Sequence, residues 1–181
     1  MNIIETVNQG GVILYPTDTI WGIGGDATNT KVIDKIFKIK ERDPNKSLLI
    51  LVDSYKMLQN YVTEIPHEIW DILEKSIEPT TIIYPNPKNL PKELLAKDGS
   101  IAIRVVGKGF AKDLIKATGK PLISTSANLS GEPNPETFDE INPLILQRVD
   151  YVVNLHRKAT SAKPSKIIRW SAKKGVEIIR D

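Results

Sequence analysis

The apolar residues of this chain fall into short uninterrupted runs and into longer stretches with helical spacing. Runs at residues 12–14 and 48–52 predict buried strands, and the second, with polar flanks, is typical of a central strand buried on both faces. Further strands are predicted at residues 80–84, 100–106, 121–123, 151–153, 167–170 and 176–179. A proline-rich loop covers residues 85–91.

Helices are predicted where apolar residues recur every three or four positions. Residues 30–41 form such a stretch, capped by Asn29 or Thr30, with one apolar face made of Val32, Ile33, Ile36 and Phe37. Other helices are expected to begin at Asp53 or Ser54, to begin near Pro66, and to lie within residues 108–118 and 138–148. Because strands and helices alternate, the class is α/β with a mixed, twisted sheet and polar loops gathered at one edge. Without a repeat or linker, residues 1–181 are expected to form a single domain.

The chain contains no cysteine, which excludes disulfide frameworks, thiol nucleophiles and cysteine-based metal sites. The first residues lack a basic segment followed by an apolar one, and no apolar run is long enough to cross a membrane. We therefore expect a soluble, cytoplasmic protein with no membrane partner.

A polar segment with three glycines, residues 15–25, follows the first predicted strand. Glycines let a backbone approach a ligand closely, and Thr17 and Thr19, two apart on extended chain, present their hydroxyls on the same side. An active-site loop has this composition, and so has an ordinary polar turn. The residues alone leave both interpretations open.

Lys40 and Arg42 end the helix predicted for residues 30–41. Because Asp43 precedes a proline and is disfavoured in the helical region, we expect extended chain here, on which residues two apart point the same way. Lys40 and Arg42 are then expected to converge, on the solvent side or in a cavity. Arg104 lies among apolar residues of a predicted strand and needs an anionic partner or a route to solvent.

A second polar cluster, residues 124–131, follows the apolar residues 121–123. It carries three serines, a threonine and an asparagine, and such small hydrogen-bonding groups can cradle a phosphate or a carboxylate. A serine-rich turn is the alternative.

The formal net charge of +3 is unevenly distributed along the chain. Residues 156–181 contain eight Lys or Arg and two acidic residues, whereas residues 1–155 carry a net charge of −3. A basic region of this kind contacts RNA or phosphates, or forms a solvated face. Contact with tRNA through the C-terminal region therefore stays open.

The motifs of P-loop proteins, dinucleotide-binding folds, zinc proteases and serine hydrolases are missing from the sequence. The two histidines are His67, in a predicted helix, and His156, beside the basic region, and both are expected to be structural or exposed. Histidine-based and covalent chemistry are therefore disfavoured.

Taken in order, the polar segments resemble those of the YrdC-like threonylcarbamoyl-AMP synthases. The matching elements cover nearly the whole chain and are residues 15–22, Lys40-Glu41-Arg42 with Lys46, Arg104, residues 124–131, and Pro164-Ser165. Each is short, but their ordered combination with an upstream Pro-Thr-Asp-Thr sequence is specific. The long form of the family has a further C-terminal domain for which 181 residues leave no room, so the chain is similar to the short, single-domain form.

This resemblance implies an unusual twisted α/β fold, a mixed sheet with helices around a large concave cavity. It also implies an L-threonylcarbamoyladenylate synthase, a nucleotidyltransferase that forms threonylcarbamoyl-AMP and pyrophosphate from L-threonine, bicarbonate or CO2, and ATP. Downstream threonylcarbamoyl-transferase proteins would pass the product to tRNA. Such a reaction needs positioning and charge neutralisation more than covalent help.

The resemblance further implies a role for each matching side chain. Lys40 and Arg42 would face the ATP phosphates as catalytic residues. The nucleotide would also be bound by Lys46, Ser126, Asn128, Ser165 and Arg180, and the threonine by Thr17, Thr19, Arg104 and Ser124. Magnesium is expected, held by ATP phosphates and water, because no cluster of carboxylates supplies a protein metal site.

Some positions depart from the residues that are usual in the family. Glu78 stands where glycine is usual, which puts the conformation of the turn at residues 77–81 in question. The other departures remove no expected phosphate ligand and are Trp21, Ser47, Val106 and Lys166.

Two other functions remain as alternatives. A non-enzymatic, RNA-binding or ribosome-associated protein of the same fold would bind RNA with a steep salt dependence and turn over no ATP. A relative that handles carbamoyl-AMP in hydrogenase maturation is disfavoured, because such proteins carry zinc-binding cysteine motifs.

Overall fold

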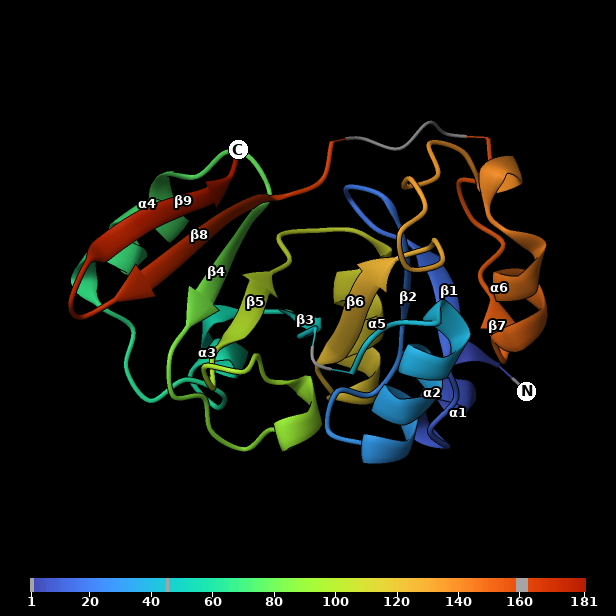
Figure 1. The fold of residues 1–181 in the computed structure, drawn as a ribbon, viewed down its shortest axis with the longest axis horizontal. Coiled ribbons are helices and arrows are strands. Elements are labelled where there is room, and N and C mark those ends of the chain that lie inside the picture. The colour runs from blue at the N-terminus through green and yellow to red at the C-terminus, as the bar shows by residue number, and fades with distance from the viewer. Residues whose placement is uncertain (1, 45, 159–162) are drawn as a thin grey trace.

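A computed structural model describes residues 2–44, 46–158 and 163–181, and within these ranges nine strands form one mixed, twisted sheet (Figure 1). The strand order is β7, β1, β2, β6, β3, β5, β4, β8, β9. Their bounds are β1 Ile13–Pro16, β2 Trp21–Gly24, β3 Leu49–Val52, β4 Thr80–Tyr84, β5 Ile101–Val105, β6 Leu122–Ser126, β7 Tyr151–Val152, β8 Lys166–Ser171 and β9 Gly175–Arg180. Strand β3 pairs with β5 on one side and β6 on the other, so the central strand predicted at residues 48–52 is confirmed.

Helices lie on both faces of the sheet. They are α1 Ile3–Asn8, α2 Thr30–Lys40, α3 Tyr55–Leu58, α4 His67–Lys75, α5 Phe110–Thr118 and α6 Pro143–Arg148, with 3-10 turns η1 Lys92–Leu94 and η2 Phe138–Glu140. The predicted cap of α2 is confirmed, because the Asn29 side chain accepts a hydrogen bond from the backbone N–H of Lys31 at 3.0 Å.

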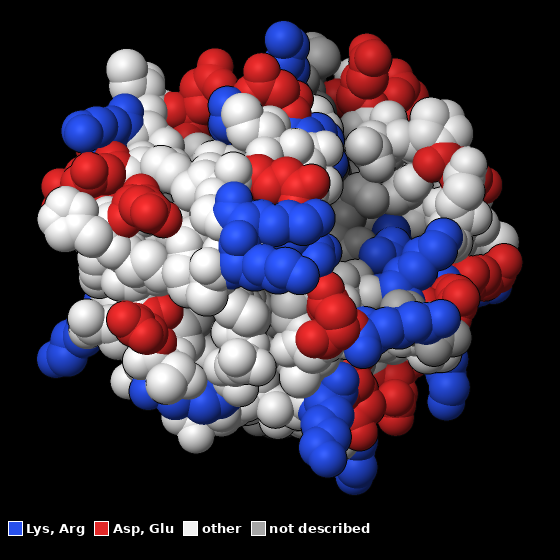
Figure 2. Space-filling model, turned by 60° about the vertical axis from the view of Figure 1, so that its left-hand side comes forward, with Lys and Arg blue, Asp and Glu red and all other residues white. Residues whose placement is uncertain are grey.

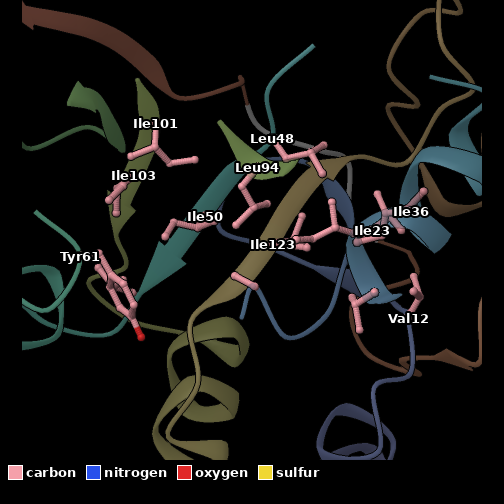
Figure 3. Close-up of a cluster of buried hydrophobic side chains, with 14 of the residues drawn as sticks. Val12, Ile23, Ile36, Leu48, Ile50, Tyr61, Leu94, Ile101, Ile103 and Ile123 are labelled. Atoms are coloured by element: carbon pink, nitrogen blue, oxygen red, sulfur yellow. The ribbon is translucent and has the colours of Figure 1, made fainter. Parts of the chain in front are cut away.

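Successive residues of β3 belong to different buried clusters, as the alternation of a strand requires. Ile50 and Ile36 of α2 belong to the same cluster. Figure 3 shows part of this cluster. Leu51 belongs to the opposite cluster, together with Leu114 of α5. Leu49 faces the same side as Leu51 and lines a cavity that the helices leave open. The sheet therefore has one face packed by α2 and one face that combines α5 with a cavity.

Two predicted polar loops are partly strand. Residues 21–24 form β2, and β6 continues through Ser124 to Ser126. Close backbone approach explains the first difference, because a Cβ added at Gly24 would lie 1.8 Å from the carbonyl oxygen of Ile123. Glycine in this segment thus permits strand packing as well as loop formation.

Local capping explains why two helices differ from the prediction. Helix α1, which the apolar pattern did not predict, has a capping box in which Asn2 and Glu5 exchange hydrogen bonds at 3.0 Å. The helix predicted within residues 138–148 is shorter, because Asn142 caps a new start and Pro143 occupies the first turn of α6.

Candidate active site

The open part of the α5 face holds a cavity of about 340 Å³, which we call the central cavity. It is lined by eight of the side chains expected from the sequence, namely Thr17, Thr19, Arg42, Arg104, Ser124, Ser126, Ser165 and Arg180. Lys40, Lys46 and Asn128 lie outside this lining. Asn134 and Leu49 line the cavity without a sequence signal, because one lies in a loop and the other in an apolar strand.

The two threonines after β1 converge as predicted, since their Oγ1 atoms lie 2.9 Å apart. Thr17 Oγ1 donates to the carbonyl oxygen of Ile20 at 2.8 Å and accepts from the backbone N–H of Thr19 at 3.0 Å. The Thr17 hydroxyl therefore holds the turn between β1 and β2. Its interactions place the Thr19 side chain, which is nearly buried, at the cavity wall.

Arg104 has the anionic partner that its place in an apolar strand requires. Its side chain is 2% exposed, and Nη1 lies 2.8 Å from Oδ1 of Asp18. The contact is an ion pair with poor hydrogen-bond alignment, because within the described residues Nε and Nη1 have no aligned acceptor. Sequence reasoning missed Asp18 as this partner, although it stands between the two threonines. Arg104 is therefore neutralised by Asp18, while two of its buried nitrogens lack a well-aligned acceptor among the described residues.

Tyr15 lies beneath this part of the cavity. Burial raises the pKa of its hydroxyl to about 12, with smaller effects from Ser124, Arg104 and Asp18. The hydroxyl donates to the carbonyl oxygen of Ile123 at 3.1 Å. This hydrogen bond joins a side chain of β1 to the backbone of β6.

Lys40 differs from the prediction in conformation and in exposure. It is the last residue of α2, Glu41 adopts a left-handed conformation with φ 51°, and the chain here is not extended. The Lys40 side chain is 1% exposed rather than solvent-facing. Its Nζ donates to the backbone oxygens of Ser126 and Asn128, the latter at 2.7 Å, and to Oδ1 of Asn128 at 3.1 Å. Burial, followed by the charge of Arg42, lowers the pKa of Lys40 to about 7.

Arg42 reaches the central cavity after the left-handed turn. Its Nη2 donates to the carbonyl oxygen of Ser47 at 2.9 Å, which fixes the guanidinium on the segment before β3. Lys46 is exposed and lies outside the lining residues. The left-handed residue therefore separates a buried lysine from a cavity-facing arginine.

On another wall, Ser165 is held by two neighbouring strands. Its hydroxyl lies 2.8 Å from Oγ1 of Thr81, and its carbonyl oxygen accepts from Nε and Nη2 of Arg180 at 3.1 and 2.7 Å. The β8–β9 register shifts so that Ile167 pairs with Arg180 while Ile168 pairs with Ile178. This bulge turns Arg180 to the side of Ile167, which also lines the cavity.

The turn at residues 77–81 forms with glutamate in place of glycine. Glu78 is not among the described residues with positive φ, so the left-handed conformation that favours glycine does not occur there. Thr81 of this segment is fully buried beside Ser165. The departure at Glu78 therefore leaves the cavity wall formed.

The basic region is partly neutralised within the described residues. Lys166 pairs with Asp181 at 2.6 Å, and Arg169 pairs with Asp98 at 2.8 Å. Figure 2 shows Lys and Arg side chains gathered in the middle of one face, with acidic side chains next to them. Both histidines are exposed, as predicted.

The described residues contain neither a cluster of metal ligands nor a membrane-spanning helix. No group of three or more His, Cys, Asp or Glu side chains there converges on a metal position. No helix in those ranges is long and apolar enough to cross a membrane.

Comparison with known proteins identifies the family. The model of the Sua5, YciO and YrdC proteins, described as "Telomere recombination", matches residues 5–181. The chain belongs to this family. The threonylcarbamoyl-AMP synthase of Pseudoalteromonas translucida is 36% identical over 154 residues, covering 83% of this chain and 82% of the relative. The threonylcarbamoyl-AMP synthase of Xanthomonas oryzae pv. oryzae (strain PXO99A) is 32% identical over 183 residues, covering 99% and 96%.

The fold is also that of solved members of this family. The structure of P. abyssi Sua5 complexed with L-threonine matches with a TM-score of 0.85 at 21% sequence identity. The match covers 98% of this chain and 52% of that protein. The YrdC-like mixed sheet expected from the sequence is therefore confirmed.

Proposed function

We propose that this protein is an L-threonylcarbamoyladenylate synthase, a nucleotidyltransferase that forms threonylcarbamoyl-AMP and pyrophosphate from L-threonine, bicarbonate or CO2, and ATP. Relatives at 32–36% identity carry the name threonylcarbamoyl-AMP synthase. The observation that carries the proposal is that one cavity combines the guanidinium groups of Arg104, Arg42 and Arg180 with several hydroxyls. A carboxylate and a phosphate chain are the two anions that such a cavity would hold together.

On the amino-acid side, the guanidinium of Arg104, which lines the cavity, binds the threonine carboxylate. Thr19 and Ser124 line the same cavity and provide hydroxyls for the rest of the substrate. Asp18 keeps the buried guanidinium neutralised before the substrate arrives. Threonine is thereby held with its amine free to form a carbamate with CO2.

On the nucleotide side, Arg42, Ser126, Ser165 and Arg180 bind the ATP phosphates. The carbamate oxygen attacks the α-phosphorus, the bond between the α-phosphorus and its bridging oxygen breaks, and pyrophosphate leaves. The arginines stabilise the negative charge that develops on the phosphate oxygens. Lys40 adds positive charge from behind the loop after β6.

Magnesium fits this site as a companion of ATP. The lining offers hydroxyls, an amide and arginines rather than a carboxylate cage, so the ion would bind phosphate oxygens and water. When bound, it neutralises phosphate charge. We further propose that residues 1–181 act as one domain, that the protein works in the cytoplasm, and that threonylcarbamoyl-transferase proteins take up its product.

The decisive experiment measures pyrophosphate release from ATP and magnesium, with and without L-threonine and bicarbonate. Release that depends on threonine, and is much weaker with serine or alanine, is the expected result. A folded protein that shows no threonine-dependent release, but binds RNA with a steep dependence on salt, would support the non-enzymatic RNA-binding function instead.

A further inference from the structure

Lys40 forms hydrogen bonds with the loop after β6, residues 127–132. The lysine Nζ donates to both oxygens of Asn128, and the backbone oxygen of Lys40 accepts from the N–H of Ser130 at 2.8 Å. This loop, which we call the Asn128 loop, therefore rests on the C-terminal end of α2. Ser126 immediately precedes it and lines the central cavity.

The side chain of Asn128 is occupied by bonds within the protein. Its Oδ1 accepts from Lys40 Nζ and from the hydroxyl of Ser126, and its Nδ2 donates to the backbone oxygen of Glu132 at 2.6 Å. Both acceptor positions of the carboxamide oxygen are thus filled. Asn128 therefore holds Ser126 at the cavity wall by accepting the proton of its hydroxyl, whose oxygen lone pairs stay available to a donor.

Glu132, the last residue of this loop, holds it through hydrogen bonds to its carboxylate. The Glu132 carboxylate accepts from the backbone N–H of Leu129 at 3.3 Å and from Nδ2 of Asn142 at 3.2 and 3.4 Å. Oδ1 of Asn142 in turn accepts from the N–H of Leu144 at 3.0 Å and caps α6. A continuous series of hydrogen bonds therefore joins the start of α6 to Ser126.

We propose that Glu132 is a positioning residue for the nucleotide site: held by Asn142, it fixes the Asn128 loop and thereby the place of Ser126 and Lys40. The proposal rests on the proposed function, because it assigns the loop to the ATP phosphates. Neither Glu132 nor Asn142 lines the central cavity, so their influence on ATP passes through the loop. The threonine side, built by Arg104 and Thr19, has no bond to this network among the described residues.

A donor–acceptor exchange between the two residues tests the proposal. Asn142→Asp sets two carboxylates face to face and loses the contact, whereas Glu132→Gln keeps a carboxamide oxygen that still accepts from Asn142. The double variant restores it, because the glutamine amide donates to the aspartate while its oxygen still accepts from Leu129. Aspartate caps a helix as well as asparagine does, and the pair keeps one negative charge.

The measurements are the dissociation constant for ATP by calorimetry and the KM values for ATP and threonine. We expect Asn142→Asp to weaken ATP binding about 5- to 20-fold and Glu132→Gln to weaken it less than about threefold, with less than twofold change in the threonine KM for either variant. The double variant should bind ATP within about twofold of the unaltered protein. Glu136→Gln is the matched control, because its carboxylate has no bonded partner among the described residues.

Each result decides the proposal. An Asn142→Asp variant that binds ATP normally, equal losses for ATP and threonine, or a double variant that is not restored would overturn it while leaving the proposed function standing. An unaltered protein that binds no ATP would overturn the proposed function and this inference together. Selective loss followed by restoration supports the positioning role, since a merely structural contact would not separate the two KM values.

Discussion

The ammonium group of Lys40 bonds to both oxygens of Asn128, at 2.7 Å to the backbone and 3.1 Å to the side chain. These contacts join the end of α2 to the loop after β6, far apart in the sequence. Lys40 therefore supports the structure of the proposed nucleotide site. A substitution at Lys40 should affect stability, which distinguishes it from Arg42.

Lys40→Met is expected to lower the free energy of unfolding by roughly 1–3 kcal/mol, because it leaves buried carbonyl oxygens without a donor. Pyrophosphate release should fall with it. Urea denaturation measures the first effect, and Lys38→Met, at an exposed position of the same helix, serves as the control. Unchanged stability of the Lys40 variant would contradict the supporting role.

Arg42→Ala is expected to reduce threonine-dependent pyrophosphate release by about 100-fold or more, the usual loss when one donor to a developing charge is removed. Its stability should change little, because the side chain is only half-buried and, among the described residues, its hydrogen bonds go to the carbonyl oxygens of the neighbouring Ser47 at 2.9 Å and Lys46 at 3.5 Å. Steady-state kinetics measure the loss of activity, and urea denaturation measures the stability. Lys46→Ala, outside the cavity, should retain activity within about threefold; full activity of the Arg42 variant would rule out its phosphate role.

Arg104→Lys keeps the positive charge beside Asp18 but removes the planar fork. The threonine KM should rise about 10- to 100-fold, which corresponds to the loss of one charged hydrogen bond. The KM for ATP should stay within about twofold. Initial-rate measurements at varied threonine and varied ATP separate these constants, and an equal rise in both would argue against a dedicated carboxylate site.

The pH dependence of stability should carry a contribution from Lys40. Its pKa in the folded protein, about 7, lies below its ordinary value of 10.5, so between these values the unfolded chain holds a proton that the folded protein lacks. The free energy of unfolding therefore gains from this group as pH rises from 7 to 10.5, and the gain is lost as pH falls back to 7. Lys40→Met should show a shallower rise in urea denaturation over pH 7–10. Parallel curves for the two proteins would refute this.

Gly24→Ala should be strongly destabilising, by about 3 kcal/mol or more, because the new Cβ would meet the carbonyl oxygen of Ile123 at 1.8 Å. Gly107→Ala is the matched control, since a Cβ there meets nothing within 4 Å and the residue does not have positive φ. Thermal denaturation compares the melting temperatures of the two variants. Similar melting temperatures would show that β2 and β6 move apart easily.

Most elements of the fold were predictable because their signals are local. The apolar run before Asp53 predicted the central strand, and the cap at Asn29 predicted the start of α2. Strand β2 was missed because three of its flanking or internal residues are glycines, which usually indicate a loop. The predicted conformation around Lys40 was wrong because the left-handed Glu41, not the proline three residues later, ends the helix.

The sequence by itself determined the class of the fold, the polar segments that supply the cavity, and the family to which they belong. It did so because hydrophobic spacing and motif order are properties of the chain alone. Only the tertiary structure decided that Lys40 is buried against Asn128, that Asp18 is the partner of Arg104, and that a β-bulge turns Arg180 toward Ser165. These relationships join residues across the sheet, and their geometry depends on how the strands and helices pack rather than on local preference.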